Sequence, residues 1–364
     1  MMRVKGKPMA SPVYHVEVKP GDSPKEWGMK AVKLFEKAGF GKMIEEGRFV
    51  ALKQHFGEGK DGKYLRAPVV RSIVDLVKAK GAKPYLTETA TLYRGQRSNA
   101  VDHLNLAYDH GFTPDAVGCP VICCDGLVGA AQVMVKIDGK HYREVPIASD
   151  IFHTHALIVL THMTGHLAAG IGGSIKNSGM GLSSRAGKMN QHHDSHPIVE
   201  EGKCTACGTC VEWCPTDAIS MKGKASVDGA KCIGCGECLA VCPAGAVGFE
   251  WGESAGRMQE KMAEHALGVS KLVKGRAAYF NFAVNMTPGC DCFAIKQNQL
   301  AADAGIFASA DPVALDQATA DAINKQAGKD VFKATYPEFK WDVQLKHGEV
   351  IGLGTRKYQL IQVE

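Results

Sequence analysis

One cysteine pattern occurs twice in the sequence, and it constrains the fold more than any other feature. The first copy runs from Cys204 to Pro215, and the second runs from Cys232 to Pro243, 28 residues later. In each copy three cysteines are separated by two residues, and a fourth follows after three more residues, directly before a proline. The two copies use eight of the 13 cysteines, so this part of the chain must fold around whatever its thiols bind.

This spacing is typical of iron–sulfur clusters. Three thiolates two residues apart wrap one loop around three irons of a [4Fe–4S] cubane, while the fourth cysteine of each copy caps the cluster of the other copy. Structural zinc, the alternative, takes two pairs of ligands in a tetrahedron and fits this pattern poorly. The predicted ligand sets are Cys204, Cys207, Cys210 and Cys242 for the first cluster, and Cys232, Cys235, Cys238 and Cys214 for the second.

The segment that carries both copies resembles bacterial two-cluster ferredoxins, and its charge differs from that of the rest of the chain. Residues 199–250 contain seven acidic residues and four lysines, a net charge of −3, which leaves +8 for the remainder. We therefore predict three parts. They are the first part of an α/β body (1–198), a small α+β two-cluster ferredoxin-like insert (199–250) and the second part of the body (251–364).

Outside the insert, short apolar runs alternate with amphipathic stretches, which predicts an α/β body. Ser23-Pro24, Pro68 and Asp311-Pro312 mark helix starts, because a capping residue or a first-turn proline precedes an amphipathic stretch. Strand–helix alternation of this kind favours a largely parallel sheet with flanking helices. The predicted strands are 13–18, 48–54, 83–88, 120–124, 156–160, 277–284 and 305–308, with a hairpin of 133–137 and 142–147 turning at Asp138-Gly139.

Composition excludes several classes of protein. With 45% hydrophobic and 22% charged residues over 364 positions, the chain is neither disordered nor fibrous. A net charge of +5 is too small over this length to indicate nucleic-acid binding. No apolar run is long enough to span a membrane, and no export signal follows the basic N-terminus. The odd cysteine count then predicts a cytoplasmic protein with metal-bound thiolates rather than a disulfide framework.

Outside the insert, seven short motifs are rich in glycine or in charged, polar or sulfur-bearing residues. They are Thr91-Leu-Tyr-Arg-Gly95, Asn99-Ala-Val-Asp-His103, Gly172-Gly-Ser-Ile-Lys-Asn177, Gly179-Met-Gly181, Ser184-Arg-Ala-Gly-Lys188, Cys290-Asp-Cys292 and Asp311-Pro-Val-Ala-Leu-Asp316. This set resembles the domain of unknown function 362 family, in its ferredoxin-bearing branch of uncharacterised iron–sulfur centre proteins. The resemblance spans nearly the whole chain and implies the interrupted architecture, but it brings no reaction with it.

The motif Cys290-Asp-Cys292 carries two candidate catalytic thiols. It follows a predicted strand and Pro288-Gly289, at the kind of strand-end loop where α/β proteins bind ligands. In a turn, the two thiols either converge on one metal or flank a redox site fed by the clusters. The alternative is a pair of ordinary buried cysteines.

Histidines form a second group of candidates, since seven of the 14 lie between residues 153 and 196. His162 and His166 have the spacing at which two histidines share a helix face and clasp a metal, although Gly165 lies between them. We take both as candidate catalytic residues. A single histidine of this kind is more often structural.

A glycine-rich stretch provides the candidate anion site. Backbone amides at Gly172 and Gly173 can cradle a phosphate or carboxylate, with Lys176 supplying charge and Asn177 a polar contact. Lys176 is also a candidate catalytic group, and Arg94 is a candidate cation at the same cleft. The alternative is a plain glycine-rich turn, because neither a phosphate-loop nor a dinucleotide pattern is complete. Further cations that, taken alone, we expect to be solvated are Lys53, His55, Arg66, Arg97 and Arg185.

Three functions fit these features, and we prefer the first. It is an iron–sulfur oxidoreductase that passes single electrons through two [4Fe–4S] clusters to a site in the body, reducing a small anionic substrate or a bound cofactor. The others are a non-catalytic electron carrier and a metallocofactor-handling protein. A redox partner protein, either a ferredoxin or an oxidoreductase, is expected. The sequence leaves open an additional metal, a third cluster or a flavin.

Overall fold

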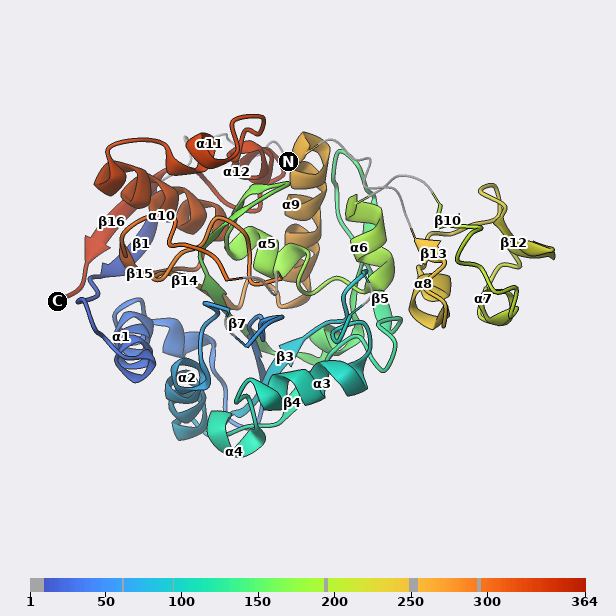
Figure 1. The fold of residues 1–364 in the computed structure, drawn as a ribbon. Helices are drawn as coiled ribbons and strands as arrows, with labels where there is room; N and C mark the ends of the chain where they lie inside the picture. Colours follow the sequence, from blue (N-terminus) through green and yellow to red (C-terminus); the bar gives the residue numbers. More distant parts are fainter. Residues whose placement is uncertain (1–9, 61, 94, 193–195, 249–254, 293–295) are drawn as a thin grey trace, which may run out of the picture.

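An eight-stranded sheet forms the centre of the body (Figure 1). The computed structural model describes residues 10–60, 62–93, 95–192, 196–248, 255–292 and 296–364. Neighbouring strands are parallel except at β15, which runs against β1 and β14, so the predicted largely parallel sheet is confirmed. In spatial order the strands are β16 (Tyr358–Gln362), β1 (Ser11–Val16), β15 (Gly305–Ser309), β14 (Ala277–Ala283), β7 (Ala156–His162), β2 (Phe49–Lys53), β3 (Lys83–Glu88) and β4 (Val121–Cys123).

Helices cover both faces of this sheet, so its central strands are buried along their whole length. All seven residues of β7 and all seven of β14 are buried. One face carries α1 (Pro24–Lys37), α2 (Ala67–Ala79), α3 (Ala100–Asp109) and α4 (Pro114–Val117). The other carries α5 (Ser174–Gly179), α9 (Ala255–Leu272), α10 (Pro312–Ala327), α11 (Val331–Thr335) and α12 (Val343–Val350).

The helix starts that the sequence predicts are built as expected. Ser23 caps α1 and forms a capping box with Glu26, and Asp311 caps α10 by accepting from two backbone N–H groups. Across the ranges that the structure covers, we find no helix whose length and apolar character would let it cross a bilayer.

Several smaller elements complete the body. The hairpin predicted around Asp138-Gly139 is present as β5 (Gln132–Lys136) and β6 (Glu144–Ala148). A second hairpin of β8 (Thr164–His166) and β9 (Gly170–Gly172) follows β7 directly, and α6 (Arg185–His192) leads towards the insert. The short helices η1 (Phe40–Met43) and η2 (Ser149–His153) precede β2 and β7.

The cysteine-rich segment projects from one side of the body, beyond α6 (Figure 1). Strands β10 (Ile198–Val199) and β13 (Val247–Gly248) pair where the segment leaves and rejoins the body. Between them lie α7 (Thr209–Glu212), the hairpin β11 (Ile219–Lys222) and β12 (Lys224–Val227), and α8 (Glu237–Val241). Its apolar side chains form a core of their own, which includes four of the cysteines.

Candidate functional site

The two halves of the cysteine-rich segment have the same local structure. Both short helices, α7 and α8, follow a glycine in the left-handed region, Gly208 at φ 80° and Gly236 at φ 72°. The fourth cysteine of each copy accepts a hydrogen bond from the backbone N–H four residues later, at 3.2 Å in both cases. The 28-residue repeat in the sequence is therefore also a repeat in three dimensions.

The first predicted ligand set converges on one cavity of about 310 Å³. Its four cysteines come from both copies of the pattern, since Cys242 belongs to the second copy. The cavity is lined by Cys204, Cys207, Cys210 and Cys242, together with small and apolar side chains. This is the exchange of fourth cysteines that a two-cluster arrangement requires.

The second predicted set is also gathered in space. Burial raises the pKa of Cys235, and the nearby thiols of Cys232 and Cys214 raise it further. Burial and the same neighbours, together with Cys210, raise the pKa of Cys238 to about 12. The interaction between Cys238 and Cys210 shows that the two sets adjoin each other.

Backbone N–H groups point at the sulfur atoms of both sets. Hydrogen bonds reach Cys214 from Ala218, Cys242 from Ala246 and Cys232 from Gly234, at 3.2 to 3.4 Å. Backbone hydrogen bonds lower the pKa of Cys204. Such bonds stabilise thiolates and tune iron–sulfur clusters. Within the described ranges, no three His, Cys, Asp or Glu side chains are placed to hold a single metal ion. A cubane does not require such a group, because each of its thiolates bonds a different iron and the thiolates therefore lie farther apart.

The loop of the second set rests on the body. A Cβ atom built on Gly236 would lie 3.0 Å from the Arg185 side chain and 3.7 Å from Leu92. Leu92 and Met189 belong to the same apolar cluster as Cys238. In the first set Cys207 is exposed, whereas Cys204, Cys210 and Cys242 are buried.

Arg185 is buried and holds neighbouring loops together, whereas the sequence suggested a solvated cation. Its guanidinium donates to the carbonyl groups of Val128, Thr91 and Ser98. These bonds fix the loop that follows β3, and Leu92 of that loop lines a cavity in the body. Arg185 therefore connects the loop of the second cysteine set to the wall of this cavity.

Two adjoining cavities lie at the carboxyl ends of the parallel strands, and we call them the cleft. They measure about 340 and 520 Å³ and share His55, Lys176 and Asn177. Strand β2 lies between β3, the next strand along the chain, and β7, so the strand order reverses between β2 and β7. Open α/β sheets bind ligands at such a switch point.

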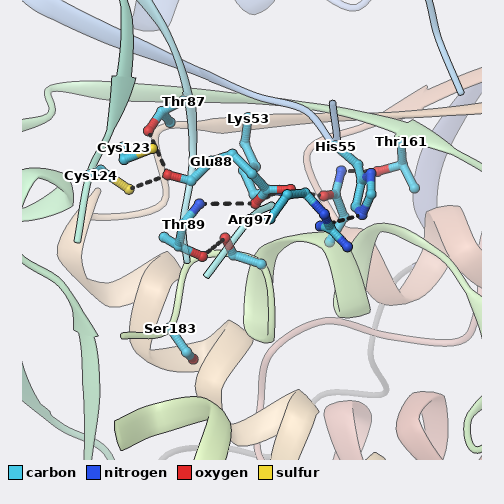
Figure 2. Close-up of polar contacts among 12 residues, drawn as sticks. Lys53, His55, Thr87, Glu88, Thr89, Arg97, Cys123, Cys124, Thr161 and Ser183 are labelled. Atoms are coloured by element: carbon cyan, nitrogen blue, oxygen red, sulfur yellow. Dashed lines mark hydrogen bonds and ion pairs between the residues drawn. The ribbon is translucent and has the colours of Figure 1, made fainter. Parts of the chain in front are cut away.

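A buried ion pair forms the floor of the cleft. Lys53 ends β2, Glu88 ends β3, and their charged groups lie 2.8 Å apart (Figure 2). Burial opposes the charge on Glu88, but the Lys53 ammonium outweighs it and lowers the pKa of Glu88 to about 2. Lys53 also donates to Asn177 Oδ1 at 2.8 Å, and the Asn177 amide nitrogen donates to β7 through Leu160 and Thr161. Asn177 thus lies in the cleft, where the sequence predicted it, and its hydrogen bonds connect the ends of β2 and β7.

Cys290 and Cys292 open into the cleft from the turn after β14. The two side chains are hydrogen-bonded to each other, and Cys292 Sγ lies 3.4 Å from His55 Nε2. The hydrogen bond from Cys290, aided by Lys176 and His55, lowers the pKa of Cys292 well below its usual range although burial opposes this. The same bond, with burial, raises the pKa of Cys290. The pKa values of the two thiols are therefore shifted in opposite directions, that of Cys292 downwards and that of Cys290 upwards.

His162 holds this turn in place. Its Nδ1 lies 2.9 Å from Asp291 Oδ1, and its Nε2 lies 2.9 Å from the carbonyl oxygen of Val284. Both partners are acceptors, so both ring nitrogens donate and the ring is an imidazolium. Burial opposes that charge, but Asp291 outweighs it and raises the pKa of His162, while His162 lowers the pKa of Asp291 against the effect of burial.

This ion pair predicts a pH window for stability. Because the pKa of His162 is raised, its contribution to stability is complete below the ordinary value of 6.5, and this contribution is lost as pH rises through the raised pKa. Because the pKa of Asp291 is lowered, its contribution is complete above 3.8 and is lost as pH falls through the lowered pKa. The Tm difference between wild type and Asp291→Asn should therefore be largest between pH 3.8 and 6.5 and shrink on either side. The exposed Arg71–Asp75 pair gives the control, Asp75→Asn. A difference that does not vary with pH would rule out the pairing.

His166 does not share a helix face with His162, in contrast to what their spacing suggests. The two lie on successive strands, β7 and β8, which only Met163 separates, and the chain turns back after His166 to form β9. His166 Nδ1 accepts from the backbone N–H groups of Ala168 and Ala169, and burial lowers the pKa of His166 to about 3. Its neutral ring is thus part of the β8–β9 hairpin, and it is absent from the lining of the two cavities.

In the glycine-rich stretch, an acidic side chain accepts hydrogen bonds from two backbone amides. Gly172 and Gly173 line the cleft, but the N–H groups of Ser174 and Ile175 donate to the Asp316 carboxylate at 2.8 and 3.0 Å. A Cβ atom at Gly173 would lie 2.5 Å from that carboxylate, so the glycine permits its approach. These two amides are therefore not available to a ligand.

Lys176 is the cation of this stretch that is left for a ligand. Burial opposes its charge, but Cys290, Cys292 and Asp291 outweigh this and raise the pKa of Lys176. Within the described ranges the Lys176 ammonium makes no ion pair or hydrogen bond, whereas the Arg97 guanidinium is paired with Glu58 at 2.5 Å. Arg94, the other predicted cation, lies outside the described residues.

Comparison with known proteins adds a family to this geometry. Over residues 50–321, more than half of the chain, the sequence matches the family described as domain of unknown function (DUF362). The chain belongs to this family. No curated protein matches the chain.

Two solved structures are similar to this DUF362 protein at low identity. The lactate racemase apoprotein from Thermoanaerobacterium thermosaccharolyticum is 10% identical with a TM-score of 0.39, over 77% of this chain and 52% of that one. A protein from Thermotoga maritima is 9% identical with a TM-score of 0.37, over 71% of this chain and 50% of that one. The chain therefore spans about half the length of each.

Some cleft residues of this DUF362 protein were not among the sequence candidates. Glu88, Tyr93, Lys188 and His192 all line the larger cavity. Burial lowers the pKa of Lys188 to about 8 and that of His192 to about 4. Tyr93 and Lys188 lie inside family motifs, which was the available signal, whereas Glu88 is marked only by its place at the end of a strand.

Proposed function

We propose that this protein holds two [4Fe–4S] clusters and passes single electrons from them into the cleft, where a small anionic substrate or a bound cofactor is reduced. The observation that carries the proposal is the contact between Gly236, beside the second cysteine set, and Arg185 and Leu92 at the cleft wall. A segment that served only as a carrier has no need to place its inner set against a cavity.

The residues present fit two cubanes. The first set surrounds a cavity, the second is gathered beside it, and backbone N–H groups point at the sulfur atoms. When bound, each cluster supplies a one-electron couple. The chain's own groups would supply eight thiolate ligands and hydrogen bonds to them. Free thiolates in this number suit a reducing compartment such as the cytoplasm.

The positions of the two sets suggest a direction for the electrons. Cys207 of the first set is open to solvent, so a redox partner protein would deliver electrons there. The second set faces the body. In the cleft, Lys176 would bind the anionic part of the substrate, because it lines both cavities and no carboxylate pairs with it among the described residues.

Metal analysis of protein purified without air tests the proposal. We expect about eight irons and about eight labile sulfides per chain. The variant Cys207→Ser should retain about four of each, because its second set is unchanged. Zinc in place of iron and sulfide would overturn the proposal. Iron clearly above eight would favour the metallocofactor-handling alternative instead.

A further inference from the structure

We infer that Cys290 and Cys292 form a dithiol–disulfide couple that receives the electrons in the cleft. The inference deepens the proposed function and takes its source of electrons from it. The first observation is the position of the two side chains, which leave the chain two residues apart at the turn of residues 291–292 and open into the two adjoining cavities of the cleft. A disulfide needs its two Cβ atoms about 3.5–4.5 Å apart, and a turn allows this closeness whereas an extended strand separates side chains two residues apart more widely.

The surroundings of the pair are those of a reactive thiol rather than of a structural cysteine. Cys290 opens into the smaller cavity and Cys292 into the larger one. Lys176 lines both cavities and His55 lies 3.4 Å from Cys292 Sγ, so positive and polar groups face the sulfur atoms. Cys119 and Cys124, by contrast, line neither cavity, and burial raises the pKa of both thiols. Reactive cysteines are found in such electropositive, partly open places.

The turn that carries the pair is held from several sides. Tyr336 donates to the carbonyl of Pro288, Gly289 N–H donates to Gln297, and Asp291 is paired with His162. These contacts fix the backbone on both sides of Cys290. The thiols can therefore open and close a bond between themselves while the backbone stays in place.

The number of electrons that this disulfide accepts equals the number that two reduced clusters can give. The disulfide accepts two electrons and one proton; its S–S bond breaks, an S–H bond forms on Cys290, and Cys292 is left as a thiolate beside Lys176. Each of the two reduced clusters gives up one electron in this step. The disulfide forms again when the anionic substrate takes the same two electrons together with the proton from Cys290. Leu92 lines the larger cavity with Cys292 and packs with Cys238, so the route from the second set is short.

An anaerobic reductive titration with a viologen mediator measures the couple directly. Wild type should take up four electrons per chain, two for the clusters and two for the disulfide, whereas Cys290→Ser and Cys292→Ser should each take up two with unchanged cluster absorbance. Cys119→Ala, a buried thiol outside the cleft, is the matched control and should take up four.

Mass spectrometry of wild type gives a second readout that needs no variant. After oxidation with diamide, the peptide with Cys290 and Cys292 should resist alkylation and be two hydrogens lighter; after reduction both thiols should be alkylated. Free thiols after oxidation, with an uptake of only two electrons, would overturn the inference. If the protein held no clusters but still formed this disulfide, the proposed function would fail and the couple would stand.

Discussion

Replacing Cys238 with serine is expected to halve the iron content, from about eight to about four atoms per chain, and to stop the reduction of the cleft. Cys238 belongs to the set that rests on Leu92 and Arg185, and its side chain is buried in the core of the insert. Without the second cluster, the first is separated from the cleft by the whole inner half of the segment. We expect the rate at which reduced viologen converts Cys290 and Cys292 to free thiols to fall at least about a hundredfold.

The matched comparison is Cys207→Ser, which removes a ligand from the outer set. Its iron content should also fall to about four, but the small viologen can still reduce the inner cluster, so the thiols of the cleft should appear at a rate close to that of wild type. The measurement is rapid mixing followed by alkylation and mass spectrometry. Equal rates in Cys238→Ser and wild type would show that electrons do not enter through the second set.

Replacing Lys53 with methionine is expected to destabilise the protein by about 3–5 kcal/mol. The change leaves the Glu88 carboxylate buried at the end of β3 without its positive partner, and it removes the hydrogen bond to Asn177. The measurement is the thermal unfolding of anaerobic protein at neutral pH, where Glu88 is charged because Lys53 outweighs the effect of burial and lowers its pKa to about 2.

Two variants separate this cost from a general loss of packing. The double variant Lys53→Met with Glu88→Gln should recover most of the loss, since no buried charge is left unpaired. Arg71→Met, which breaks an exposed pair with Asp75, should cost no more than about 1 kcal/mol. The interpretation of the cleft floor would be wrong if the double variant were no more stable than Lys53→Met alone.

Features that depend on neighbouring residues in the chain were predictable from the sequence. The capped helix starts at Ser23 and Asp311 and the strand 83–88 follow from local capping and apolar patterns, and the structure contains them. The polar stretch after Gly328 gave weaker signals. It contributes α11, α12 and the edge strand β16, whose residues are half exposed and therefore lack an apolar pattern.

Features that depend on the order of strands in the sheet were not predictable. Lys53 and Glu88 meet because β2 and β3 are neighbours, and nothing in either stretch of sequence states this. Asp316 takes the amides after Gly173 although it lies far along the chain, so the glycine pattern alone suggested an anion cradle. Arg185 looked like a solvated cation because arginines usually are, and its burial depends on three carbonyl groups from distant loops.

Low-temperature electron paramagnetic resonance of the reduced, air-free protein is the most direct test of two clusters held by exchanged fourth cysteines. Wild type should give signals of two reduced [4Fe–4S] clusters that integrate to about two spins per chain and broaden each other, because the two cysteine sets adjoin. Cys242→Ser should lose the signal of the outer cluster and Cys214→Ser that of the inner one. A colourless protein without such signals, or a loss of the inner signal in Cys242→Ser and of the outer signal in Cys214→Ser, would contradict the proposed ligand sets.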